Sequence, residues 1–183
     1  MELLRDNAGW VALRLSEVPA AAPFADGATV PICDVPHRIR HRPDARGAAW
    51  IEDGELHVAG EAAFLPRRVG DFLRAEAGWR IAAIVRAKAA LIGASPKRVA
   101  IKDTSSRWGS CAPDGTLAFS WRLVMAPEAV QDYVVSHEVA HLRHMNHGPR
   151  FWALTESLTP HRALATAWLN REGARLQRVG RGG

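Results

Sequence analysis

The chain contains two histidines and a glutamate at a spacing that can support metal chemistry. His137, Glu138 and His141 form the pattern H-E-x-x-H, and His147 follows six positions after His141. Histidines four residues apart lie on one face of a helix, so both imidazoles can bind one Zn²⁺. Glu138 is rotated around the helix by one residue, which lets its carboxylate reach a water beside the metal without being a ligand. A zinc ion, an activated water and a carboxylate base are the minimal equipment for peptide-bond hydrolysis.

The residues around this pattern predict a buried amphipathic helix from Pro127 to Leu142. No Gly or Pro follows Pro127 in this segment, and Val135, Val139 and Leu142 recur at i, i+4 and i+7. Proline is well accepted at the first position of a helix, where its missing N–H would have no partner anyway. We therefore expect the histidines to lie on a core-facing helix.

Length and composition indicate one soluble globular domain. The chain has 183 residues, of which 48% are hydrophobic and 23% are charged. No apolar run is long enough to span a bilayer, and the N-terminus lacks a signal-peptide pattern, so we expect no membrane partner. Cys33 and Cys111 are far apart and form no C-x-x-C pair. A reduced, cytoplasmic protein is the simplest interpretation, although the sequence also allows a single disulfide.

The net charge of +5 concentrates in two stretches, one within residues 37–46 and one after residue 170. Such clusters could bind nucleic acid or an acidic partner. The clusters contain no interspersed aromatic residues and match no nucleic-acid-binding motif. We therefore interpret the first as a solvent-exposed face and the second as a loose basic tail. The arginines concerned are Arg38, Arg40, Arg42 and Arg46 in the first stretch and Arg171, Arg175, Arg178 and Arg181 in the second.

The first half of the chain predicts a small sheet followed by a long helix. Residues 1–28 lack clear periodicity and are interpreted as an irregular lead-in. Asp53-Gly54, between two alternating segments, predicts a hairpin. A helix is expected to begin near Pro66 and to end before Gly93. Its expected core-facing residues are Val69, Phe72, Leu73, Ala77, Ile81, Ile84, Lys88 and Leu91.

The second half predicts further strands and then helices. Val99–Ile101 is expected to be a strand, and Ala112–Gly115 a turn because Pro and Gly occupy favoured turn positions. Thr116–Val124 is interpreted as one strand that is covered on both faces. After a break at residues 144–148, two helices are expected, over Arg150–Leu158 and from Pro160 to about Leu176.

Several separate motifs occur in a fixed order: Arg107-Trp108-Gly109-Ser110-Cys111, Trp121-Arg122-Leu123, Ala126-Pro127, Asp132–Glu138 and Asn146–Trp152. Together they resemble the YgjP-like zinc metallopeptidase family, a relative of the SprT-like and WLM proteases. The resemblance is dense from about Lys97 to Pro160, thins toward Val30 and leaves residues 1–28 outside. Family members often carry Asn at Ser120 and Leu at Val139, and neither position is a presumed ligand.

The resemblance implies an α+β fold: a compact zincin-like domain in which a small mixed or antiparallel sheet packs on an active-site helix and further helices. It also implies Zn²⁺ on His137, His141 and His147, with Glu138 as the general base. We expect a lead-in over 1–28, a single domain over 29–178 and a basic, glycine-containing tail over 179–183.

Other residues near the site leave alternatives open. Glu156 is a rival third ligand, and it could instead orient a ligand imidazole or form a surface salt bridge. Asn146 is expected to adopt a left-handed turn conformation, and His144 to be exposed or to support a ligand. Tyr133 is better explained by packing than by oxyanion stabilisation. Arg107, Trp108 and Arg122 could line the cleft. A place in the core or at its rim is the preferred interpretation for Trp108 and Trp121, and Cys111 is interpreted as a small buried hydrophobic residue.

The predicted function is zinc-dependent hydrolysis of a peptide or protein substrate. Hydrolysis of a non-peptide amide would use the same four residues. A third function is that of a non-enzymatic binding module, recruited to DNA or to the ribosome through the basic clusters, with a structural zinc ion. The last is disfavoured because a structural zinc site usually has four protein ligands. We further expect an extended peptide to pair with Thr116–Leu123 as an edge strand.

Overall fold

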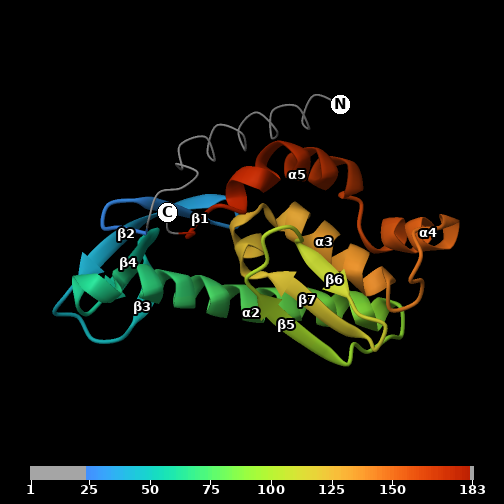
Figure 1. The fold of residues 1–183 in the computed structure, drawn as a ribbon, viewed down its shortest axis with the longest axis horizontal. Coiled ribbons are helices and arrows are strands. Elements are labelled where there is room, and N and C mark those ends of the chain that lie inside the picture. Colours follow the sequence, from blue (N-terminus) through green and yellow to red (C-terminus); the bar gives the residue numbers. More distant parts are fainter. Residues whose placement is uncertain (1–23, 182–183) are drawn as a thin grey trace.

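The computed structural model describes residues 24–181, which form an α+β fold with two small sheets and four α-helices (Figure 1). The α+β prediction is therefore confirmed. Most of the predicted lead-in lies outside the described residues. Phe24, within its last part, packs in the hydrophobic core, and so does Val179 from the predicted tail. The core thus reaches beyond residues 29–178 at both ends.

The N-terminal sheet has four strands in the order β1-β2-β4-β3. The strands are β1 (Thr29–Ile32), β2 (Val35–Arg42), β3 (Ala49–Glu52) and β4 (Glu55–Ala59). β2 and β4 are parallel, whereas the other pairs are antiparallel. The predicted hairpin joins β3 and β4, with Asp53 at φ 51° and Gly54 at φ 74°. Positive φ at both central residues is what a tight two-residue hairpin requires.

Helix α2 (Leu65–Leu91) runs along the length of the domain and contacts strands of both sheets (Figure 1). The short 3-10 helix η1 (Ala62–Phe64) precedes it, and Gly93 follows it at φ 59°. The predicted apolar stripe is correct for Val69, Leu73, Ala77 and Ile81, and it then continues by four-residue steps through Val85 and Ala89. Lys88 and Leu91 were therefore wrongly assigned to the core, and Leu91 is 72% exposed.

Lys88 connects α2 to two later helices through polar contacts. Its ammonium group lies 2.7 Å from the Asp132 carboxylate and donates a hydrogen bond of 2.6 Å to the carbonyl of Leu158. A charged group with two such partners tolerates partial burial, which explains why a lysine falls within an otherwise apolar helix pattern.

The second sheet has three strands in the order β5-β7-β6. These are β5 (Arg98–Lys102), β6 (Gly109–Cys111) and β7 (Thr116–Ser120), with the predicted turn before β7 closed by a 2.9 Å hydrogen bond from Gly115 N–H to Ala112 O. β7 is the central strand, so the expectation that residues 116–123 form a free edge is wrong. β5 and β6 are the outer strands of this sheet.

The predicted strand to Val124 is also too long, because the chain turns into the 3-10 helix η2 (Trp121–Met125) after Ser120. The Ser120 hydroxyl accepts a hydrogen bond of 3.3 Å from Arg122 N–H and caps this turn. All five residues of η2 are buried. The apolar residues of η2 are therefore explained by the burial of this turn rather than by a strand covered on both faces.

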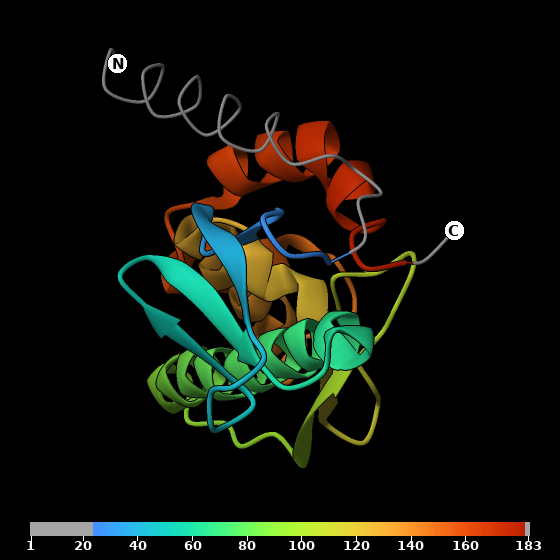
Figure 2. The same ribbon diagram turned by 90° about the vertical axis from the view of Figure 1, so that its left-hand side faces the viewer.

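Three helices complete the domain: α3 (Glu128–Ala140), α4 (Pro149–Leu158) and α5 (Arg162–Leu176). They correspond closely to the three predicted helices. α3 contacts α2, α4, α5 and β6, and Figure 2 shows α5 and α2 on opposite sides of the molecule. Val135 and Val139 of α3 are fully buried, as expected from their spacing. α3 is thus held on several sides, which fixes the direction of the side chains at its C-terminal end.

Cys33 and Cys111 are both unpaired. Among residues 24–181, no helix is both long and apolar enough to cross a membrane.

Candidate metal centre

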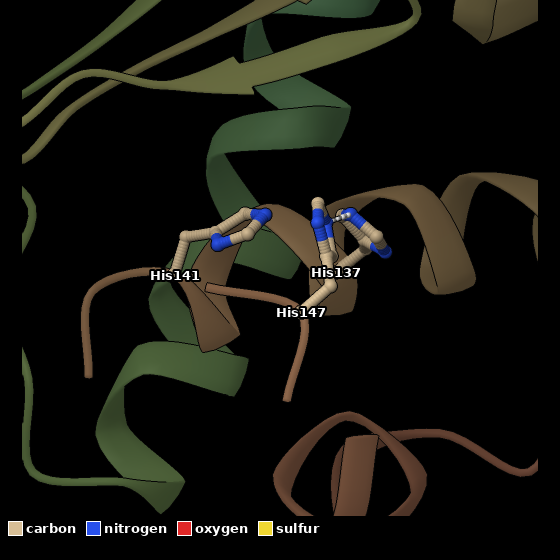
Figure 3. Close-up of side chains that lie close together, drawn as sticks. All are labelled: His137, His141 and His147. Atoms are coloured by element: carbon tan, nitrogen blue, oxygen red, sulfur yellow. Dashed lines mark hydrogen bonds between the residues drawn. The ribbon is translucent and has the colours of Figure 1, made fainter. Parts of the chain in front are cut away.

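The three predicted histidine ligands meet at the C-terminal end of α3 (Figure 3). His137 lies in the last turn of α3, and His141 follows its last residue with helical angles of φ −63° and ψ −20°. His147 comes from the loop between α3 and α4. One ligand atom from each residue lies within 4.8 Å of the other two. Within the described part of the chain, this is the only group of three or more such side chains placed to hold a metal ion.

The geometry of these imidazoles fits a metal ion. The Nε2 atoms of His137 and His147 are 3.1 Å apart, close to the roughly 3.3 Å between two ligands bound tetrahedrally at about 2.0–2.1 Å. His141 Nδ1 donates a hydrogen bond of 3.0 Å to the carbonyl of His144. This bond leaves His141 Nε2 with its lone pair available for a metal.

The protonation of the histidines also suits a cation. Burial, together with the neighbouring histidines and Arg162, lowers the pKa of His137 to about 4. Burial likewise lowers the pKa of His141, although its hydrogen bond to the His144 carbonyl opposes this. Both rings are therefore neutral at pH 7, the form in which imidazole binds metals.

Glu138 lies on the buried side of α3, only 7% exposed, against strand β6. Burial raises the pKa of its carboxyl group to about 7, with the charge of Arg107 acting in the opposite direction. Among residues 24–181 the carboxylate has no hydrogen-bond or ion-pair partner. A carboxylate with a pKa near neutrality and no competing partner is well suited to accept and return a proton.

The position of Glu138 depends on Gly109, for which the sequence alone predicts no role beyond membership of a motif. A Cβ atom on Gly109 would lie 2.7 Å from Cγ and 2.9 Å from Oε1 of Glu138. Gly109 does not have a positive φ, so space rather than backbone conformation requires glycine here. The sequence signal was its place in R-W-G-S-C, but the contact with α3 is visible only in the folded chain.

Glu156, the rival third ligand, lies outside the histidine cluster. Its carboxylate forms an ion pair with Arg162 at 2.5 Å. The ring of His147 instead contacts Phe151 and Trp152, with centroid distances of 4.7 Å and 5.7 Å. The structure thus shows Glu156 in an ion pair, and it is His147 rather than Glu156 that lies close to the other two histidines.

Several other residues do not have the expected placement. Arg122 is fully buried and hydrogen-bonded to Asp103 and to the carbonyl of Val179, so it does not line a cleft. Asn146 does not have a positive φ, and the loop contains instead a 2.8 Å hydrogen bond from Gly148 N–H to Asn146 O. His144 supports His141, but through its main-chain carbonyl rather than its ring.

The remaining aromatic and sulfur groups serve packing. Tyr133 and Trp121 belong to the core, as expected. Trp108 lies beside Gly173 of α5, its Nε1 3.5 Å from where a Cβ atom on Gly173 would be. Burial, with smaller effects of the Glu138 and Asp114 charges, raises the pKa of the Cys111 thiol. A protonated thiol is a poor nucleophile, which agrees with the structural role expected of Cys111.

Imidazoles that converge at a helix end, beside one buried carboxylate, are the arrangement expected of a metal-dependent hydrolase. The comparison with known families names the class more closely. The model of the YgjP-like metallopeptidase domain matches residues 1–172, so the chain belongs to the YgjP-like family. The match begins at residue 1, and the family relationship therefore includes residues 1–28, contrary to the sequence reading. No curated protein and no solved structure matches the chain significantly.

Proposed function

We propose that this metallopeptidase is a zinc enzyme that hydrolyses peptide bonds, with His137, His141 and His147 as metal ligands and Glu138 as general base. The observation that carries the proposal is the convergence of three imidazoles next to a buried, unpartnered carboxylate. Three histidine ligands leave a fourth position open, which distinguishes catalytic from structural zinc sites.

Zinc, when bound, would supply Lewis-acid polarisation of the scissile carbonyl and of the attacking water. The chain's own residues supply proton transfer and orientation. Glu138 accepts the proton of the attacking water on its carboxylate and then delivers it to the nitrogen of the leaving amine. The main-chain carbonyl of His144 holds the ring of His141 in the tautomer whose Nε2 is unprotonated.

The outer edge of β6 offers a place for the substrate backbone. Hydrogen bonds join Ala112 to Thr116 and Ser120 to Trp108, and bonded pairs alternate along an antiparallel ladder. The main-chain groups of Gly109 and Cys111 therefore point away from β7. An extended peptide that pairs with this edge would pass beside Glu138, since Gly109 contacts that side chain.

The test is to load the full chain with zinc and incubate it with a diverse peptide library, using Glu138→Gln as the matched control. Elemental analysis should give about one zinc per chain, as for a single catalytic site. Mass spectrometry should then find cleaved peptides only with the wild-type protein. A His137→Ala/His141→Ala double variant that retained all of its zinc would contradict the ligand assignment. Cleavage of small amides but of no peptide would transfer the activity to a non-peptide substrate.

The third ligand is tested by two single variants in a zinc competition titration. His147→Ala should remove most of the zinc, because a direct ligand is lost. Glu156→Ala should weaken binding by no more than about 10–100-fold, as the loss of a supporting residue does. The opposite ranking would assign the ligand role to Glu156.

A further inference from the structure

His147 differs from the other two histidines in how its ring is held. His137 and His141 are fixed by α3, and His141 also donates a hydrogen bond to a main-chain carbonyl. His147 lies on an exposed loop, and within residues 24–181 the only hydrogen-bond partner of its ring is His137. Metal-binding histidines usually have their second nitrogen oriented by a hydrogen bond. Among residues 24–181 neither His137 nor His147 has such a partner, but His137 is held by α3 whereas His147 lies on a loop.

The ring of His147 is held by an aromatic contact instead of a hydrogen bond. The rings of His147 and Trp152 are stacked, with an angle of 27° between their planes. Trp152 is only half-buried on α4, so the core does not fix its rotamer completely. Phe151, by contrast, is fully buried and meets the His147 ring at 86°.

Trp152 is in turn held by a charged pair that joins α4 to α5. The guanidinium carbon of Arg162 lies 3.7 Å from the centroid of the Trp152 ring. Arg162, the first residue of α5, is paired with Glu156, which is one helical turn after Trp152 on α4. Residues four apart share a helix face, so Trp152 and Glu156 can both meet the same guanidinium.

We propose that Glu156, Arg162 and Trp152 act as positioning residues that hold the ring of His147 in its metal-binding orientation. This inference rests on the proposed function, in which His147 is a ligand. It assigns Glu156 a part in metal binding without direct contact with the metal or with a histidine.

Because Arg162 is positively charged, the change in zinc affinity of an Arg162→Ala variant can separate a positioning role from a purely electrostatic effect. A cation near a metal site disfavours a bound metal ion, and Arg162 already contributes to lowering the pKa of His137. On charge alone, Arg162→Ala should therefore strengthen zinc binding. If Arg162 instead positions Trp152, its removal should weaken zinc binding, so the two explanations predict opposite signs.

The experiment measures zinc affinity of the full chain by competition with a chromophoric chelator. Trp152→Leu should weaken binding by about 10–100-fold, the usual result of losing a group that orients a ligand. Trp152→Phe, which preserves an aromatic face, should retain most of the affinity. Arg162→Ala should weaken binding by about two- to fivefold, the equivalent of an exposed cation–π contact.

α2 provides a matched control in a similar trio remote from the histidines. Arg80 lies 4.6 Å from the centroid of the Trp79 ring and is paired with Glu76 at 3.1 Å. Arg80→Ala should leave zinc affinity unchanged. Thermal melts of the metal-free variants, followed by circular dichroism, establish that each is folded, and Arg162→Ala decides the question if Trp152→Leu does not fold.

Unchanged or tighter zinc binding by Arg162→Ala would overturn the inference, as would wild-type affinity in a folded Trp152→Leu variant. Neither result would affect the proposed function, which requires that the three histidines bind zinc and that Glu138 is the base, but not that Trp152 or Arg162 orients His147. A wild-type chain that bound no zinc would instead overturn the proposed function itself.

Discussion

Glu138 and Arg122 are both almost completely buried charged side chains, yet their surroundings are opposite. Arg122, in η2, donates hydrogen bonds to the Asp103 carboxylate and, at 2.8 Å, to the carbonyl of Val179. Its guanidinium also lies 4.3 Å from the centroid of the Trp121 ring. Glu138, on α3, has no such partner among residues 24–181, and burial raises the pKa of its carboxyl group to about 7.

This difference indicates that the charge of Arg122 stabilises the fold, whereas the carboxylate of Glu138 is available for chemistry. A buried charge with complete partners connects parts of a fold, and here Arg122 joins η2 to the chain after β5 and to the C-terminal segment. A buried carboxylate without partners destabilises the fold, and proteins keep such groups mainly where function requires them. Both residues lie in motifs of the YgjP-like family, so motif membership alone does not reveal which of the two roles a residue has.

The largest expected effect is on catalysis, and it comes from Glu138→Gln. Glutamine is nearly isosteric but cannot accept a proton, so the rate of hydrolysis should fall by about 10²–10⁴-fold. Zinc content should be unchanged. The melting temperature should not fall, because the variant removes a buried group that has no partner. Peptide turnover and calorimetry on the same preparation check both statements, and a clear loss of stability would show that Glu138 has a structural role like that of Arg122.

A smaller effect is expected from Gly109→Ala, which should displace Glu138 without removing it. The added methyl group would overlap Cγ of Glu138 at 2.7 Å, so the carboxylate must move. A displacement near 1 Å can cost about 10²-fold in rate. We expect a lower kcat, with zinc affinity retained because the atoms nearest to the added methyl group all belong to Glu138. In a Glu138→Gln background the same substitution should have little additional effect. An equal loss in both backgrounds would mean that Gly109 acts on something other than the base.

For the Arg122 site, Asp103→Asn should reduce the free energy of unfolding but leave the rate of hydrolysis unchanged. The variant leaves the buried guanidinium of Arg122 with a weaker partner, at a cost of about 1–3 kcal/mol. The lower part of this range is favoured because the Asp103 side chain is 49% exposed. Denaturant unfolding measures the loss, while kcat of the folded fraction should stay at the wild-type value. A loss of activity without a loss of stability would move Arg122 into the active site.

The ion pair between Asp103 and Arg122 predicts how the stability of the folded chain depends on pH. Burial tends to raise the pKa of Asp103, but hydrogen bonding and charge from Arg122 outweigh it, so the pKa lies below the ordinary 3.8. The ionised carboxylate therefore stabilises the folded chain above about pH 4, and this contribution disappears as the pH falls through the lowered pKa. The stability difference between wild type and Asp103→Asn should be present at pH 7 and shrink in acid. A difference that grew toward low pH would contradict the pairing.

The smallest expected effect is a local change in hydrogen exchange. When a peptide inhibitor saturates the site, the amides of Gly109 and Cys111 should exchange more slowly, because they face the outer edge of β6. The amides of β7 already lie inside the sheet and should change little. Protection confined to β7 would contradict the assignment of β6 as the substrate edge.

The sequence predicted most of the secondary structure because local patterns determine it. The hairpin at Asp53-Gly54 and the helix starts near Pro66, Pro127 and Pro149 follow from residue types with strong backbone preferences. Predictions failed where a long-range contact decided the outcome. Thr116–Val124 was read as one strand because apolar residues fill a strand and a buried 3-10 turn equally well. Lys88 was placed in the core because its pairing with Asp132 is not visible in a periodicity.

The spacing of His137, Glu138 and His141 by itself determined that two imidazoles and a carboxylate would share one end of a helix, because helical geometry is local and regular. Only the tertiary structure decided the rest. It brought His147 rather than Glu156 to the other histidines, placed Gly109 against Glu138, and removed Arg122 from the site into the core. Each of these outcomes depends on contacts between residues far apart in the chain. Such contacts are set by how whole elements pack, and no local pattern of residues encodes them.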